Sequence, residues 1–148
     1  MMEKIIAMYE ENRKNEAAYD AAEAANDQAG MEAERARHHE LCQEARDNGK
    51  DFCFMLRLYT SMKERGNVVI DLNDVHENQV EEVAGILLKF GVKKFTFSST
   101  WSSAISAAWE FCQHGFIMDG MIQINSESQN FHTGEWKKAP AIVFTVNE

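Results

Sequence analysis

The spacing of apolar residues divides the chain into two unlike parts. Residues 1–50 are rich in Ala, Glu and other charged residues, contain no proline, and carry a thin apolar stripe that fades after Tyr19. This pattern predicts polar helices with a break near Gly30. From residue 51 the apolar positions become dense, and Phe52, Met55 and Tyr59 fall on one face of a helix. We therefore predict a charged helical arm at 1–50 and an α/β domain at 51–148 that begins with its own buried helix.

Beyond that helix, strand-like and helix-like patterns alternate. Their order, β-α-β-α-β-β, indicates an α/β (or α+β) fold with a four-stranded mixed sheet, whose first three strands are parallel and whose last two form an antiparallel hairpin. Asp119-Gly120 predicts a turn or bulge before the third strand. The hairpin is expected to close over residues 132–135, with Phe131 and Trp136 paired across it. The strands are expected at 68–70, 95–97, 121–125 and 141–146, and the helices at 75–90 and 104–114.

The expected strand order rests on how each strand is buried. Residues 68–70 are wholly apolar, which is typical of a central parallel strand covered on both faces. Phe95 and Phe97 instead alternate with polar residues, which indicates a strand at the edge of the sheet. We therefore expect the order 2-1-3-4, with 1-2-3-4 as the alternative.

A hydroxyl-rich turn at 98–103 separates the second strand from the following helix. Five of its six residues carry a hydroxyl, and only Trp101 does not. At such a turn of an α/β unit, backbone N–H groups converge and the helix dipole favours an anion. The plainer interpretation is that one serine caps the helix and the others form the turn. Because Ile105 and Trp109 share a helical stripe, we expect Trp109 to be buried and Trp101 to be partly exposed.

Polar residues follow each of the three parallel strands, whose carboxyl ends share one edge of the sheet. That edge is where α/β folds bind ligands. The competing interpretation assigns these residues to caps and loops, with Asp74 and Glu77 as a capping box. No phosphate motif or metal-ligand spacing completes the set, so we assign no catalytic residue, metal or cofactor. The candidate ligand-binding residues are Asp71, Asn73, Asp74, His76, Ser98, Ser99, Thr100, Trp101, Ser102, Ser103 and Asn125.

Charge and cysteine content exclude several classes of function. The net charge is −9 and both halves of the chain are acidic, so no basic face is available to a nucleic acid. Cys42, Cys53 and Cys112 are odd in number and widely spaced, which argues against a disulfide framework and for a reducing compartment. No apolar run approaches the length of a membrane span or a signal-peptide core. We expect a cytoplasmic protein that forms a homodimer or binds another protein through its N-terminal helices.

The strings FTFSSTWSSA, AWEF and MIQIN, with the opening MEKIIAMYE, resemble a small uncharacterised protein family of gut Firmicutes. Its members are often found among genes of mobile or conjugative elements. The resemblance runs the full chain and implies a cytoplasmic bacterial accessory protein, without any activity, cofactor or partner. Two hypotheses remain open. One is a non-enzymatic interaction or regulatory module; the alternative is a small-molecule or phosphate-binding protein, a hydrolase included, that uses the edge of the sheet.

Overall fold

The computed structural model describes residues 1–148 and divides them into two compact units, Met1–Tyr59 and Thr60–Glu148. Helix α3 (Lys50–Arg65) crosses the boundary between them. The expected boundary at residue 50 stays a prediction. No helix combines the length and the apolar content that a membrane crossing requires.

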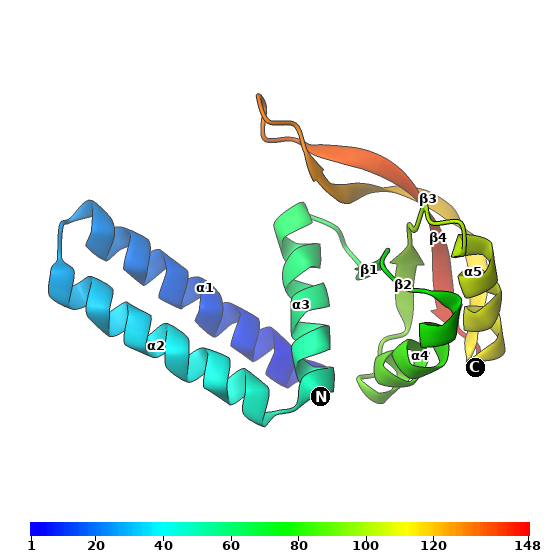
Figure 1. Ribbon diagram of the computed structural model, residues 1–148, viewed down its shortest axis with the longest axis horizontal. Coiled ribbons are helices and arrows are strands. Elements are labelled where there is room, and N and C mark those ends of the chain that lie inside the picture. Colours follow the sequence, from blue (N-terminus) through cyan, green and yellow to red (C-terminus); the bar gives the residue numbers. More distant parts are fainter. The chain divides into compact units, whose positions relative to one another are not determined.

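The first unit is built on a hairpin of two long helices, α1 (Met2–Ala24) and α2 (Gln28–Asp47), which Figure 1 shows side by side. Asp27 begins α2, because its carboxylate accepts a hydrogen bond from the Gly30 N–H at 3.0 Å. Gly30 therefore lies inside the first turn of α2 rather than at the break. A Cβ atom at residue 30 would collide with the Asp27 carboxylate, so glycine keeps the cap in place.

The second unit is a mixed α/β fold, with helices packed on a four-stranded sheet. The class, the N-terminal helical region and the final antiparallel hairpin were all expected and are confirmed. Its elements after α3 are β1 (Asp71–Leu72), the 3-10 helix η1 (Glu77–Gln79), α4 (Val80–Lys89), β2 (Lys94–Phe97), α5 (Ala104–Gln113), β3 (Phe116–Gln129) and β4 (Trp136–Val146).

Both expected strand orders are wrong, because the observed order is β1-β2-β4-β3. Strand β4 returns between β2 and β3 and pairs antiparallel with each. Strand β2 is therefore an interior strand, and its Thr96 side chain is fully buried beside Asp71 rather than facing solvent. Strand β3 still runs in the same direction as β1 and β2, as two successive antiparallel pairings require.

The first strand lies later in the chain than expected. Val68 is 89% exposed and Val69 is half-buried, so residues 68–70 do not form a central strand. The chain leaves α3 through Gly66, whose φ of +70° favours glycine, and it is still bending at Val68. The first ladder bond comes only where the Thr96 N–H donates to the Ile70 carbonyl at 2.9 Å.

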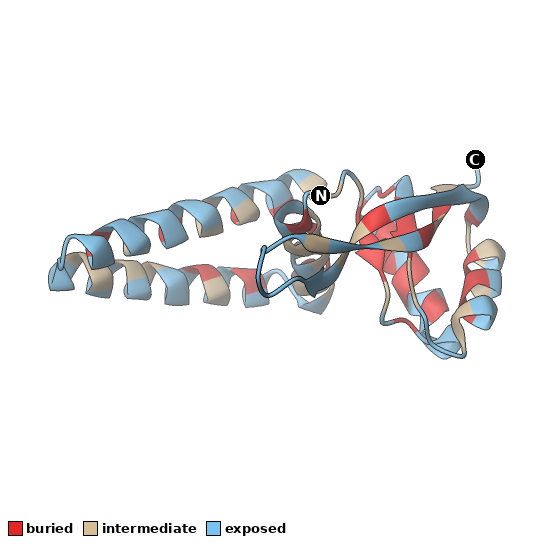
Figure 2. Cartoon of the chain, turned by 90° about the horizontal axis from the view of Figure 1, so that it is seen from above, coloured by how far each residue is buried: buried red, intermediate tan, exposed pale blue.

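A cluster of phenylalanines fills the core between the sheet and α5. Phe95, Phe111, Phe116 and Phe144 are fully buried, with ring centroids 4.9–6.4 Å apart. Figure 2 shows the buried residues of this unit gathered on the sheet and on the inner faces of its helices. Such edge-on and offset ring pairs stabilise a core beyond the area that they bury.

Helix α5 faces the opposite way from the expectation. Phe111 turns to the core together with the small Ala107 and Ala108, whereas Ile105 is 86% and Trp109 is 63% exposed. The prediction that Trp109 is buried is therefore wrong. Small residues against the sheet let the helix approach closely enough for Phe111 to reach the ring cluster. This orientation sends the larger side chains outward.

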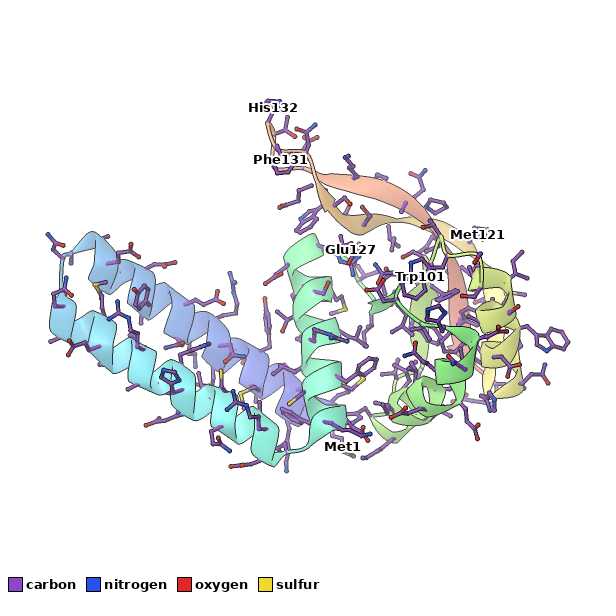
Figure 3. All side chains as sticks on the ribbon, in the orientation of Figure 1. Met1, Trp101, Met121, Glu127, Phe131 and His132 are labelled. Carbon is purple, nitrogen blue, oxygen red and sulfur yellow. The ribbon has the colours of Figure 1, made fainter.

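The hairpin of β3 and β4 is longer than expected. Asp119-Gly120 forms a bulge, as expected, although it lies within β3 rather than before it. Trp136 pairs with Gln129, and Phe131 is fully exposed in the connecting loop, so the expected aromatic pair does not form. Figure 3 shows Phe131 at the tip of this hairpin.

Candidate functional site

The structure separates the candidate residues into a group around the buried Asp71, in which Ser98 and Asn125 are half-buried, and an exposed group; the first is called the buried group below. The buried group joins Asp71, Ser98 and Asn125, from the ends of β1 and β2 and from β3. The exposed group joins His76, Trp101 and Ser103, from the start of η1 and the turn before α5. The convergence expected at the strand ends is therefore only partial.

The Asp71 carboxylate is the centre of the buried group, and it is 3% exposed. Its Oδ1 accepts a hydrogen bond from the Thr96 hydroxyl at 2.8 Å, and its Oδ2 accepts one from the Ser98 hydroxyl at 2.6 Å. Arg65 at the end of α3 places Nη1 at 3.5 Å from the same Oδ2. Each carboxylate oxygen is therefore bound by groups of the protein itself, which is the usual arrangement for a buried structural charge.

Arg65 links Asp71 to the edge strand. Its Nη1 also donates to the Asn125 carbonyl at 3.2 Å, and its own carbonyl accepts from the Asn125 side chain at 2.6 Å. Asn67 makes two further bonds to the Asn125 backbone. No sequence pattern pointed to Arg65 or Asn67, because a basic residue in the last turn of a helix and a polar residue after it are ordinary helix-end residues.

Burial raises the pKa of the Asp71 carboxyl above its usual range. Hydrogen bonds from Ser98 and Thr96 and the charge of Arg65 act in the opposite direction, and they offset only part of that shift. A raised pKa in a carboxyl group often marks a functional site. Here the group is sealed and internally bonded, and no group of three His, Cys, Asp or Glu residues gathers to hold a metal. The geometry therefore indicates a structural role for Asp71.

The exposed group is built around a stacked pair of rings. His76 lies over Trp101 with centroids 4.6 Å apart and planes inclined by 37°, and the Ser103 hydroxyl lies 3.4 Å from His76 Nδ1. Trp101 is 40% exposed, as expected, and Figure 3 shows it in the turn ahead of α5. No carboxylate bonds the His76 ring, so the contact between His76 and Ser103 lacks the third group that orients a catalytic base.

The other candidate residues belong to turns. Asp74 is exposed, and the prediction that it forms a capping box with Glu77 is wrong. The helix η1 begins only at Glu77, and its start is capped instead by the Gln79 side chain, which accepts a hydrogen bond from the His76 N–H at 2.9 Å. Ser99 accepts from the Trp101 N–H at 3.2 Å and so shapes the turn. The remaining candidates, none of which bonds to either group through its side chain, are Asn73, Thr100 and Ser102.

A groove beside α5 is a feature of the second unit that the sequence did not reveal. Its volume is about 550 Å³, and it lies between α5 and the outer part of β3 and β4. Its most exposed apolar side chains are those of Ile105 (86% exposed), Met121 (65%), Trp109 (63%) and Met118 (57%). Hydroxyl groups enter only at one end, from the turn after β2. The lining residues are Phe97, Ser98, Ser99, Thr100, Ala104, Ile105, Ala108, Trp109, Cys112, Met118, Met121, Pro140 and Ile142.

A second cavity, of about 450 Å³, lies on the hairpin of α1 and α2. The residues that line it are of polar or charged types, among them His38, His39 and Arg35. Asn15 also lines it, and its side chain donates to both the carbonyl and the carboxylate of Glu34 at 2.8 and 2.9 Å. These bonds join α1 to α2 and account for the burial of Asn15.

Comparison with known proteins identifies a family. The family model described as a domain of unknown function (DUF7698) matches residues 54–146, which is more than half of the chain. The matched span begins inside α3 and contains the Asp71 network, the exposed ring pair and the groove beside α5. No curated protein and no solved structure matches the chain.

Proposed function

The chain belongs to the DUF7698 family, a domain of unknown function, and we propose that it is a protein-interaction module. The observation that carries this proposal is the apolar groove between α5 and β3. We propose that the groove receives an apolar segment of a partner protein, with Trp109 as the central contact. This refines the hypothesis of a non-enzymatic module by giving it a surface.

The groove has the composition of an interface core. Trp and Met are enriched at the centre of protein interfaces, and the flexible Met side chain adapts to partners of different shape. Fully burying a large apolar side chain stabilises a complex by about 1.5–3 kcal/mol. Ile105, Trp109, Met118 and Met121 are each more than half exposed, so a bound segment has this gain available at several adjacent positions.

The distribution of polar groups supports binding rather than chemistry at this surface. The buried carboxylate of Asp71 is engaged by Ser98, Thr96 and Arg65. The groove itself is lined by apolar side chains and by the hydroxyls of Ser98 to Thr100. A lining of this kind recognises shape and apolar surface, with a few hydroxyls to orient the bound group.

The test compares two tryptophans of the same unit. Trp109 lines the groove, whereas Trp101 is outside it and stacks on His76. Affinity capture from the source cells, followed by quantitative mass spectrometry, is expected to recover a partner with the wild type and with Trp101→Ala but not with Trp109→Ala. A photo-reactive amino acid at position 109 should cross-link the same partner. Equal capture by the two variants would count against the groove.

A small apolar molecule is the second candidate for the same groove. Its volume of about 550 Å³ lies within the range of small-molecule sites, and three hydroxyl-bearing residues stand at one end. Phosphate is disfavoured there, since no cationic side chain lines the groove. Melting-temperature screens with phosphate, nucleotides, Mg²⁺ and apolar compounds separate these cases, because a ligand of the folded state raises the melting temperature. A rise with apolar compounds alone would favour this candidate.

The helical hairpin of α1 and α2 is a further surface in the proposal. We propose that it contacts a second copy or another protein, as its charged outer faces and thin buried stripe favour packing against another chain. A cytoplasmic bacterial setting is part of the same proposal. It is supported by three free cysteines, Cys42, Cys53 and Cys112, which suit a reducing compartment.

A further inference from the structure

The outer strand of the sheet, β3, has backbone groups that face away from its neighbour. In an antiparallel ladder both polar groups of a residue point to the same side. The backbone N–H groups of Thr96 and Ser98 donate to β1. The backbone N–H and C=O of Phe97, between them, therefore point to the other side, toward its partner Ile142 in β4. The backbone N–H and C=O of Ile142 thus point toward β2 and not toward β3. The backbone N–H and C=O of Met121, its partner in β3, must therefore point away from β4, to the outer edge of the sheet.

The same alternation places Gln123 and Asn125 on the outer edge with Met121. Gln123 lies opposite Pro140, which has no N–H to offer, as expected of a pair that exchanges no bonds. Asn125 gives direct evidence. Its N–H donates to Asn67 Oδ1 at 3.0 Å, and its carbonyl accepts from Asn67 Nδ2 at 2.9 Å, both from outside the β3–β4 ladder.

Asn67 therefore acts as a substitute for a neighbouring strand, but only at one residue. Its carboxamide offers one acceptor and one donor, as a strand residue would, and so it covers the edge at Asn125. On the other side, the Asp119-Gly120 bulge interrupts the edge. Between these two limits the backbone N–H and C=O groups of Met121 and Gln123 form an open window, and no lysine or proline protects it.

We propose that a second copy of the chain pairs antiparallel at this window, about a two-fold axis that passes at Ile122. The window is symmetric about Ile122, which is the condition for self-pairing. Met121 then lies opposite Gln123 of the partner subunit, and Gln123 opposite Met121 of the partner subunit. Each such pair exchanges two N–H···O bonds. In this register the Asp119-Gly120 bulge of each copy lies opposite Asn125 of the other, whose backbone is already bonded by Asn67. The two places where β3 cannot pair with a new strand therefore lie opposite each other.

This pairing is self-limiting. A two-fold contact uses the same patch on both copies, so it closes after two chains and leaves no β3 edge open to a further strand. The axis stands perpendicular to the sheet, so the Met121 side chains of both copies lie on the same face as α5. The inference goes beyond the proposed function, because it rests on the backbone of β3 and not on the groove.

Two double variants test the pairing and its register. Met121→Lys with Gln123→Lys places like charges opposite each other in both pairs, and should raise the dimer Kd roughly ten-fold or more. Met121→Glu with Gln123→Lys places opposite charges in the same positions and should keep the dimer. Both residues are exposed, so the fold tolerates either change.

Sedimentation over a range of concentrations, on the full chain, gives the readout. We expect a dimer for the wild type and for the Glu/Lys variant, and a monomer for the Lys/Lys variant, with unchanged circular dichroism for all three. A wild type that stays monomeric at every concentration overturns the proposal. So does a dimer that both variants keep equally, which would assign the contact to another surface such as α1 and α2. Failure of the groove proposal is seen separately, at Trp109.

Discussion

Removing the Asp71 carboxylate tests whether the strand-end network is structural. In Asp71→Ala, Arg65 keeps its bonds to the Asn125 carbonyl and to Ser61 but loses its only carboxylate partner while it is 5% exposed. The hydroxyls of Thr96 and Ser98 lose their acceptor as well. Breaking a buried pair by removing one partner costs about 3–5 kcal/mol. This is a large part of the roughly 5–15 kcal/mol that stabilises a typical domain.

The reverse substitution, Arg65→Met, should behave differently because a carboxyl group can be neutralised and a guanidinium cannot. Without Arg65, the pKa of Asp71 rises further above its ordinary value of 3.8, since the charge of Arg65 is one of the causes that lower it. A group whose pKa is raised on folding contributes stability below its unfolded pKa and loses that contribution as pH rises through the folded pKa. Arg65→Met should therefore lose more stability relative to the wild type at neutral pH than near pH 4.

Urea unfolding followed by tryptophan fluorescence measures both effects. All three tryptophans, at positions 101, 109 and 136, lie in the unit Thr60–Glu148, so the signal reports on that unit. Asp119→Ala, at an exposed position, is the control and should change stability by no more than about 0.5 kcal/mol. The double variant Asp71→Ala/Arg65→Met should cost less than the sum of the single changes. A loss below about 1 kcal/mol in Asp71→Ala, or a flat pH response in Arg65→Met, would refute the buried ion pair.

The same unfolding assay gives the remaining predictions. Phe111→Ala should cost about 3–5 kcal/mol because the ring is fully buried among four other phenylalanines, whereas the loss in Trp109→Ala should stay below about 1 kcal/mol because that ring is mostly exposed. Equal losses would place both rings in the core. Ser103→Ala should change stability by less than about 0.5 kcal/mol, since Ser103 stands at the start of α5 without a side-chain cap bond. A loss near 1 kcal/mol would show that it caps the helix in solution.

Local patterns predicted the elements of the second unit well and their arrangement poorly. The stripe of α4 was found because Val80, Val83 and Leu87 recur with the period of a helix, and all are buried. The hairpin and the bulge at Asp119-Gly120 also follow from local turn chemistry. Strand order does not, because it depends on which strand β4 meets on its return. No local pattern in residues 136–146 distinguishes β2 from β3 as its neighbour.

The candidate site shows the same division. Asp71 and Ser98 were placed together correctly because both follow parallel strands that pair directly, with Asp71 opposite Thr96. Asn125 joins them only through Arg65, the last residue of α3, which no sequence pattern marked as part of a site. Side-chain networks that cross between elements depend on tertiary packing, and composition alone does not reveal their members.

The orientation of α5 is the most informative difference between pattern and structure. Ranking by hydrophobicity turns Ile105 and Trp109 inward, yet the core is already filled by Phe95, Phe116 and Phe144, and Phe111 completes it. Since these rings occupy the core beside α5, the helix turns its small residues Ala107 and Ala108 to the sheet and keeps Trp109 outside. The large apolar side chains left outside cost solubility and gain nothing within this unit. Large apolar side chains exposed on a folded domain are expected where that surface binds a partner. The exposure of Ile105 and Trp109, which the sequence pattern placed in the core, is thus itself an argument for a partner at the groove.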